Sequence, residues 1–356
     1  MNLLYIWIET KAFKSDTLTI YLLTFEEKME DYTSTTPYYE TCDYDAIEYL
    51  GVQLSYTYYF MFLFSLVGNG LVLVIIHRFE RLTTVTNIFL LNLVVSSLIF
   101  ISSLPFQAVY MQLSDWIFGI TMCKIVGSVY YLGFYSSGLF LALLTFDRHL
   151  AVVYSLGAPR LINQHCALLC CAVVWLVSSL ACIPWMIIYK AFHYPPSSKT
   201  FCHTYPDDFT YHLGNPTFYR QLFIFLLFPL VVIVYCYIRI AITVITSKLV
   251  TKFKTVRLIF VIVLLFFISW IPYNVVLLID HRPFKCKRRI YVGQITNIYF
   301  CISPIFYIFV GGKFQNYFRQ MVVKRFPGLK KYISVDQAMP TESTQNELSS
   351  VMAHSL

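Results

Sequence analysis

The chain has 356 residues, of which 58% are hydrophobic and only 13% are charged, with a mean hydropathy of +0.62. Soluble domains are typically about 45–50% apolar and about 25% charged, so this composition excludes a disordered chain and argues against an ordinary soluble enzyme. The net charge of +8 is unevenly placed, because residues 1–50 hold ten acids and three bases and the rest of the chain nine acids and 24 bases. Those bases lie between apolar runs and not on one soluble face, which argues against a nucleic-acid partner.

The first 28 residues lack the pattern of a signal peptide. Glu9 interrupts the apolar run 1–8, and no clear small-residue cleavage site follows it. We expect translation to begin at Met29, the alternative being a mobile extension that starts at Met1.

An acidic, tyrosine-rich segment follows, over residues 30–49, with six acids and no Lys or Arg. Tyrosines flanked by acids in a secreted segment are candidate sulfation sites, and the combined negative charge would attract and steer a basic protein ligand. The alternative is a solvated acidic tail without a partner. The candidate ligand-binding residues in this segment are Tyr32, Tyr38, Tyr39, Asp43, Tyr44 and Asp45.

Seven stretches contain no Asp, Glu, Lys or Arg, and each reaches or nearly reaches the roughly 20 residues that a helix needs to cross a bilayer. They are residues 55–76, 86–109, 125–146, 166–189, 221–238, 258–279 and 290–310. Membrane strands would show alternation over about 10 residues, which does not occur here. Because the backbone must satisfy its own hydrogen bonds in lipid, we predict an all-α membrane protein, a bundle of seven transmembrane helices.

The short loops set the expected orientation, because Lys and Arg collect on the cytoplasmic side. Basic residues follow the first, third, fifth and seventh spans, so the acidic amino terminus is expected outside the plasma membrane; five bases between the sixth and seventh spans break the rule. We expect an extracellular amino terminus over 1–54 and the bundle over 55–311. A short amphipathic helix is expected on the cytoplasmic membrane surface over 312–326, and a disordered cytoplasmic tail over 327–356.

Short motifs occur in order along these spans. They are Gly68-Asn69-Gly70, Leu91-Asn92-Leu93, Leu104-Pro105, Trp116-Ile117-Phe118-Gly119, Cys123, Asp147-Arg148-His149, Trp175, Pro229, Tyr237, Ser269-Trp270-Ile271-Pro272-Tyr273-Asn274 and Ser303-Pro304-Ile305-Phe306-Tyr307. Each motif is weak by itself, but the ordered set resembles the rhodopsin-like (class A) G-protein-coupled receptors over roughly residues 40–326. Within that family it is most similar to the chemokine receptors of the CC and XC types. The resemblance identifies the amphipathic helix after the bundle as helix 8.

Ten cysteines divide into six within the spans, which we expect to pack as small apolar side chains, and four outside them. Four cysteines in an oxidising compartment allow three pairings. The resemblance implies that Cys123 pairs with Cys202 and Cys42 with Cys286; the alternative leaves two of them unpaired. No spacing fits a metal site or a catalytic arrangement, so neither a cofactor nor enzymatic activity is expected.

The resemblance also implies two functional groups of residues. Tyr58, Gln107, Trp116, Tyr130 and Tyr273 would contact the ligand, the alternative for the tyrosines being ordinary core packing. Ligand binding would bias a two-state bundle whose prolines act as hinges. The candidate switch residues are Asp147, Arg148, Tyr237, Trp270, Pro272, Pro304 and Tyr307. For Arg148, the alternative is a boundary side chain that snorkels to lipid headgroups.

Several residues depart from the family pattern. Ser97 stands where many relatives carry the Asp that holds sodium, and Ser303 and His149 replace the usual Asn and Tyr. A cation leaves water poorly without a carboxylate, so we predict no strong sodium site and a weaker restraint on the active state. Gln107 and Gly293 stand where a pocket Trp and Glu are usual.

The function expected from the resemblance is a cell-surface receptor that binds a CC or XC chemokine and activates a heterotrimeric G protein. Phosphorylation of the Ser- and Thr-rich tail would recruit arrestin, and the remaining partner is membrane lipid. The first alternative is a scavenger that internalises chemokine with little coupling, motivated by the altered motifs; receptors captured by viruses show similar drift. The second is a transporter, which would require mid-span charges or paired broken helices that the sequence lacks.

Overall fold

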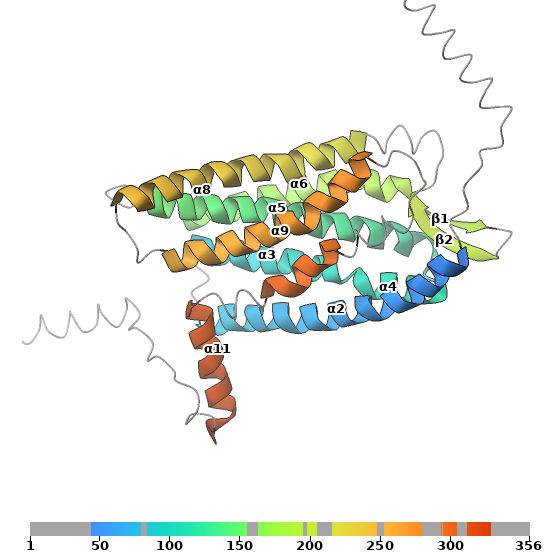
Figure 1. The fold of residues 1–356 in the computed structure, drawn as a ribbon, viewed down its shortest axis with the longest axis horizontal. Helices are drawn as coiled ribbons and strands as arrows, with labels where there is room; N and C mark the ends of the chain where they lie inside the picture. Colours follow the sequence, from blue (N-terminus) through green and yellow to red (C-terminus); the bar gives the residue numbers. More distant parts are fainter. Residues whose placement is uncertain are drawn as a thin grey trace, which may run out of the picture.

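The computed structural model describes residues 44–79, 84–154, 163–194, 198–204, 216–247, 253–279, 293, 295–304 and 312–328. These residues form a bundle of long helices that run side by side (Figure 1). Within the described residues, six helical segments are long and apolar enough to cross a membrane. They coincide with the first six predicted spans, and helical residues 295–304 lie within the seventh.

The elements follow one another in chain order. They are α2 (Tyr44–Phe79), α3 (Val85–Ile101), α4 (Leu104–Leu113), α5 (Gly119–Val153), α6 (Gln164–Ile188), β1 (Tyr189–Tyr194), β2 (Lys199–Thr204), the π-helix η1 (Gln221–Leu227), α8 (Phe228–Ser247), α9 (Phe253–Ile279) and α11 (Gly312–Arg325). The strands lie at one end of the bundle and α11 at the other, and we call these the hairpin end and the α11 end (Figure 1).

The second span is interrupted where the sequence predicted one continuous helix. Helix α3 ends at Ile101 and α4 begins at Leu104, with Pro105 in its first turn. Proline has no amide hydrogen to continue the preceding turn. The hydroxyls of Ser102 and Ser103 donate to the carbonyls of Ile99 and Phe100, at 2.7 Å each, and so partner carbonyls of the last turn of α3.

The fifth span contains the π-helix η1, which leads into α8 just before Pro229. Proline cannot donate to the carbonyl four residues earlier, which is that of Phe225. This carbonyl approaches α5 closely, because a Cβ added at Gly138 would lie 3.0 Å from the Phe225 oxygen. Glycine at position 138 therefore lets the two spans pack where the helix geometry changes.

The strands β1 and β2 pair antiparallel and carry Cys202 opposite Ala191. The sequence predicted that the fourth span would extend to Tyr189, but α6 ends at Ile188 and Tyr189 begins β1. Each strand has only six residues, too few for an alternation that would distinguish the hairpin, so it was not predicted from the sequence.

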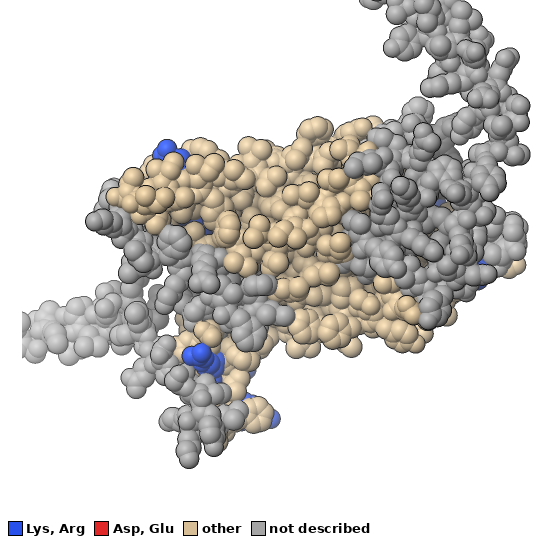
Figure 2. Space-filling model, in the orientation of Figure 1, with Lys and Arg blue, Asp and Glu red and all other residues tan. Residues whose placement is uncertain are grey.

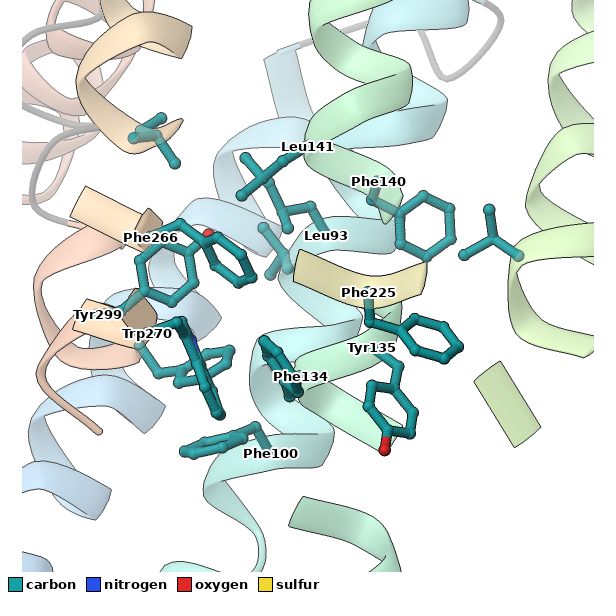
Figure 3. Packing of buried hydrophobic residues seen from close by; sticks show 14 of the residues in the cluster. Leu93, Phe100, Phe134, Tyr135, Phe140, Leu141, Phe225, Phe266, Trp270 and Tyr299 are labelled. Atoms are coloured by element: carbon teal, nitrogen blue, oxygen red, sulfur yellow. The ribbon is translucent and has the colours of Figure 1, made fainter. Parts of the chain in front are cut away.

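Aromatic side chains fill the middle of the bundle (Figure 3). Trp270 of α9 stacks on Phe134 of α5 with ring centroids 3.7 Å apart. Phe100 of α3 stacks on Phe300 at 3.7 Å, and its edge faces Trp270. The last residues of α3, the middle of α5, α9 and the 295–304 helix thus meet through one aromatic contact network.

The outer surface of the bundle is apolar, as expected for helices surrounded by lipid. Large side chains such as Leu63, Leu169 and Val231 are at least 59% exposed. Figure 2 shows no charged side chain among the coloured atoms over the middle of the bundle. An exposed apolar face of this extent needs a membrane or a partner to cover it.

Helix α11 begins beside the end of α2 and points away from the bundle at a steep angle to the spans (Figure 1). The ring of Tyr317 stacks on that of Phe79, the last residue of α2, with centroids 5.0 Å apart and planes at 13°. Within the described range 312–325, its basic side chains and apolar Phe, Met and Val side chains make it amphipathic, as predicted for helix 8.

Candidate ligand and signalling sites

The predicted disulfide between Cys123 and Cys202 is present, with an S–S distance of 1.99 Å. It joins the first turns of α5 to β2. Trp116 packs against this disulfide and is only 2% exposed. Its indole N–H donates to the Gly119 carbonyl at 2.8 Å, and its backbone N–H donates to Thr200 at 2.8 Å. This placement makes Trp116 a support of the hairpin end.

The three tyrosines of the spans that were predicted to contact ligand, Tyr58, Tyr130 and Tyr273, come together near the hairpin end. The Tyr130 hydroxyl lies 2.9 Å from the Thr296 hydroxyl, which ties α5 to the 295–304 helix. The hydroxyls of Tyr58 and Tyr273 lie close enough to the Tyr130 hydroxyl to interact with it electrostatically. Beneath them, Trp270 contacts both Tyr130 and Tyr273, with centroids 6.0 and 6.1 Å apart. Thr296 was not among the predicted site residues.

A buried polar chain crosses the bundle close to these tyrosines. The Trp185 indole donates to the Tyr135 hydroxyl at 2.7 Å, and this hydroxyl donates to the Gln221 amide oxygen at 3.4 Å. The Gln221 amide N–H donates to Asn274 at 3.0 Å, and Asn274 donates to the Trp270 carbonyl at 2.9 Å. These hydrogen bonds connect α6, α5, η1 and α9. A shift of α9 near Trp270 would therefore displace Asn274 and strain its hydrogen bond with Gln221 of the π-helix.

The predicted switch pair lies near the α11 end of α5. The Asp147 carboxylate accepts from the Arg148 guanidinium at 2.6 and 3.1 Å. The same oxygen accepts from the Thr86 hydroxyl at 2.7 Å, and Arg148 also contacts that hydroxyl. Thr86 belongs to the first turn of α3. The pair is therefore anchored to a second span, which the sequence did not indicate.

The other predicted switch residues lie in the described helices, except for Tyr307, which is outside the described residues. Tyr237 packs its ring edge-on against Phe260, joining α8 to α9. Pro272 lies inside α9. Pro304 packs on Gly68, where an added Cβ would come within 2.9 Å of the proline ring.

Comparison with known proteins decides the family. Residues 68–306 match the family described as 7 transmembrane receptor (rhodopsin family). The chain is 32% identical to human C-C chemokine receptor type 8 over 342 residues, which cover 91% of the chain and 95% of that receptor. The chain belongs to the chemokine receptors of the rhodopsin family.

Other relatives agree with this assignment. The receptor is 33% identical to C-C chemokine receptor type 3 of Cavia porcellus over 88% of the chain and 92% of that protein. It is 32% identical to G-protein coupled receptor E1 of Equine herpesvirus 2 (strain 86/87), over 81% and 77% of the two chains. The receptor is thus a multi-pass plasma-membrane protein with seven transmembrane helices and is not an enzyme.

The remaining predicted site residues are described only in part or not at all, apart from Gln107. Tyr44 and Asp45 begin α2, but only their backbone is described. Gln107 is half-buried in α4. The residues outside the described ranges are Tyr32, Tyr38, Tyr39, Cys42, Asp43, Cys286 and Tyr307.

Three of the residues that depart from the family pattern, Ser97, His149 and Ser303, are buried in the receptor's interior. Ser97 is 2% exposed, and its hydroxyl donates to the Leu93 carbonyl at 3.1 Å. The hydroxyls of Ser137 and Ser303 are buried without a hydrogen-bond partner among the described residues. These neutral groups do not fit a sodium ion, because a cation leaves water readily only where a carboxylate compensates it. Among the described residues, no group of three or more His, Cys, Asp or Glu could hold a metal ion.

We predict that replacing Ser97 by Asp makes the receptor's stability depend on sodium. A carboxylate at this 2% exposed position costs several kcal/mol unless a cation accompanies it. The melting temperature of Ser97→Asp should therefore be higher in sodium chloride than in choline chloride, whereas the natural receptor and the neutral Ser97→Asn should melt alike in both. A sodium effect on the natural receptor would contradict this.

Proposed function

We propose that the protein is a cell-surface receptor that binds a CC or XC chemokine at its hairpin end and activates a heterotrimeric G protein at its α11 end. The observation that carries this proposal is the similarity to C-C chemokine receptors over about nine-tenths of the chain. The tyrosine cluster above Trp270 and the anchored Asp147–Arg148 pair support it, since they lie at opposite ends of the same spans.

Charge supports the orientation of this receptor. At the α11 end, Arg78, Arg239, Lys324 and Arg325 are basic, and Asp147 is the described acid there, already paired with Arg148. By the positive-inside rule this end faces the cytoplasm and the amino terminus lies outside. The acidic tyrosine-rich segment 30–49 would then meet the basic chemokine first.

In the proposed mechanism, the ligand acts on the tyrosine cluster and on Trp270 below it. Trp270 belongs to α9, where Pro272 interrupts the helical hydrogen bonding and provides a hinge. Movement of α9 would change its contact with Tyr237 through Phe260. Release of Arg148 from Asp147 would complete the active state and admit the G protein, and phosphorylation of the tail would recruit arrestin afterwards.

The decisive experiment measures chemokine binding and G-protein activation in parallel, in cells that express the chain from Met29 and from Met1. A panel of CC and XC chemokines should contain at least one that binds and activates. Binding and uptake without activation would favour the scavenger, and absence of binding by a well-displayed receptor would contradict both proposals.

One structural feature favours the scavenger as the second candidate. His149, which replaces the usual Tyr beside Arg148, is 3% exposed and packs among the rings of Phe146, Tyr154 and Tyr235. Its ring nitrogens have no hydrogen-bond partner among the described residues. Because its ring is packed against these aromatic side chains, His149 would not extend toward a G protein, and coupling would be weaker.

We predict that Thr86→Val raises activity in the absence of ligand. Valine keeps the shape of threonine but removes the hydroxyl that holds Asp147, and a hydrogen bond to a charged group contributes about 1.5–3 kcal/mol. If the bond restrains only the resting state, the active population should rise at least about tenfold. G-protein activation without chemokine measures it, with Thr246→Val, an exposed threonine bonded only to its own helix, as the control. Unchanged basal activity at equal surface display would contradict a restraining role for Thr86.

A further inference from the structure

His149 is a buried titratable side chain that the proposed mechanism does not use. It follows Arg148 near the end of α5 and is 3% exposed. Its ring packs against those of Phe146 and Tyr154 and, from α8, that of Tyr235, with ring centroids 6.0, 6.0 and 5.9 Å away. We call this enclosure the His149 niche. It is built of aromatic rings from two parts of the bundle.

The niche does not satisfy the polar atoms of the imidazole. Both ring nitrogens are buried without a hydrogen-bond partner among the described residues. A neutral imidazole has one N–H donor and one acceptor, whereas an imidazolium has two donors and a full charge. Burying a charge without partners costs far more than burying a neutral polar group. The ring can therefore stay in the niche as a neutral group but not as a cation.

The groups that α8 brings to the ring also oppose a proton. The Arg239 guanidinium lies close enough to repel a positive charge on His149. The other titratable groups in the niche are the phenols of Tyr154 and Tyr235, which carry no charge at neutral pH. The described helices α3, α6, α8 and α9 contain no acidic residue that could pair with the ring from a neighbouring span.

The acid nearest in the sequence does not compensate the ring either. Asp147 lies two positions before His149, and two positions correspond to about 200° around an α-helix. Its carboxylate already accepts hydrogen bonds from Arg148 and Thr86. The niche therefore has no anion within the described residues to stabilise an imidazolium.

We propose that proton uptake by His149 releases its ring from the niche and opens the α11 end, so that acidification of the cytoplasm raises coupling to the G protein. A ring that has left the niche for water can take up a proton near pH 6.5, as imidazole does. Because the released state binds the proton and the packed state does not, a lower pH shifts the population toward the released state. The proposal rests on the proposed coupling to a G protein.

Release of the ring would act on the contact between α5 and α8. Tyr235 of α8 would lose the aromatic neighbour that α5 supplies, so the two spans would be held less firmly where the G protein is expected to enter. If the packed ring takes up no proton, the released population should rise about fourfold between about pH 7.5 and about pH 6.0.

The first test measures ligand-free nucleotide exchange by a purified G protein, with the full-length receptor in lipid nanodiscs, over this pH range. Exchange by the G protein without receptor is subtracted at each pH. The natural receptor should show the fourfold rise, whereas His149→Phe, which keeps an aromatic ring but cannot take up a proton, should show none. A flat response of the natural receptor, or an equal rise in the variant, would overturn the proposal.

Two further variants make the test specific. The matched control His165→Gln removes an exposed histidine from the first turn of α6 and should keep the full rise. Arg239→Gln removes the exposed cation that opposes the proton, so the packed ring should tolerate protonation better and the rise should be smaller. Loss of the rise in His165→Gln would assign the proton to that histidine and overturn the proposal.

A second readout needs no G protein. Exchange of the ring C2 hydrogen for deuterium, followed by mass spectrometry of the receptor alone, reports access of water to each histidine. His149 should exchange more slowly than the exposed His165, and the ratio of their rates should rise about fourfold over the same pH range. A ratio near one throughout, or a low ratio that does not change, would overturn the proposal. A rising ratio in a receptor that activates no G protein would support release of the ring and contradict only the proposed function.

Discussion

The Gly133→Ala variant is expected to lose most of its surface display. A Cβ at position 133 would lie 2.5 Å from the Cβ of Phe100, 2.8 Å from its Cα and 2.9 Å from its backbone nitrogen. Because the obstacle is backbone, no rotamer change can relieve it, and α3 would have to move away from α5. Phe100 is also stacked on Phe300, so the displacement would spread through the aromatic core. Overpacking of this kind costs about 3 kcal/mol.

Gly70→Ala is the matched control for this prediction. No atom lies within 4 Å of a Cβ added at Gly70, and the residue is within helix α2. Alanine is favoured over glycine inside a helix by roughly 0.5–1 kcal/mol, so the control should be neutral or slightly stabilising. Antibody staining of intact cells and melting temperatures in detergent measure both variants. Similar display of the two would show that α3 and α5 do not pack as closely as described.

Removal of the Cys123–Cys202 disulfide should have a comparably large effect. The bond closes a loop with a sequence separation of 79, and the loss of that constraint on the unfolded chain corresponds to about 4–5 kcal/mol. It also fixes the hairpin to the first turns of α5, beside Trp116. We expect the double variant Cys123→Ser with Cys202→Ser to lose chemokine binding and most of its display.

Replacing both cysteines avoids a leftover thiol that could pair with another. Cys166→Ser, which changes an exposed cysteine that is free, is the control and should behave like the natural receptor. Reduction of the natural receptor with dithiothreitol should reproduce the double variant. If chemokine binding survives in the double variant at normal affinity, then the hairpin is not part of the ligand site.

The spans could be predicted because lipid imposes a simple rule on composition. The charge-free run 166–189 lies within two residues of α6, whereas the helices over 125–146 and 221–238 extend five to nine residues further at each end. The internal irregularities could not be predicted, because an all-apolar segment has no periodicity that reveals a π-turn or a break. Pro229 predicted a bend in the fifth span but not that the helix would widen there, and no break at Pro105 in the second span was expected.

For the candidate sites, the residues that the family motifs contain could be predicted, but most of the residues that contact them could not. Cys123, Cys202 and the Asp147–Arg148 pair were identified through the resemblance, and the structure shows what surrounds them. Thr86 could not have been identified, since it lies 61 positions from Asp147 and a threonine at the start of a helix is unremarkable. Gln221 gave a usable signal, because it was an isolated amide at the edge of an apolar run and its burial required partners.

The π-helix in the fifth span has a consequence for how this receptor can change over generations. A π-turn accommodates one residue more than an α-turn, so the segment Gln221–Leu227 behaves as an insertion held in place by Pro229 and the neighbouring Gly138. Deletion of one residue there would restore a regular α-helix and leave residues 216–220 and α8 in nearly the same relative orientation, because the widened turn already absorbs the additional residue. The same deletion in a regular α-helix would rotate one flank by about 100° relative to the other. The span can therefore gain or lose a single codon at Gln221–Leu227 while the side chains at the hairpin end and the contacts of Tyr237 at the α11 end both stay in register.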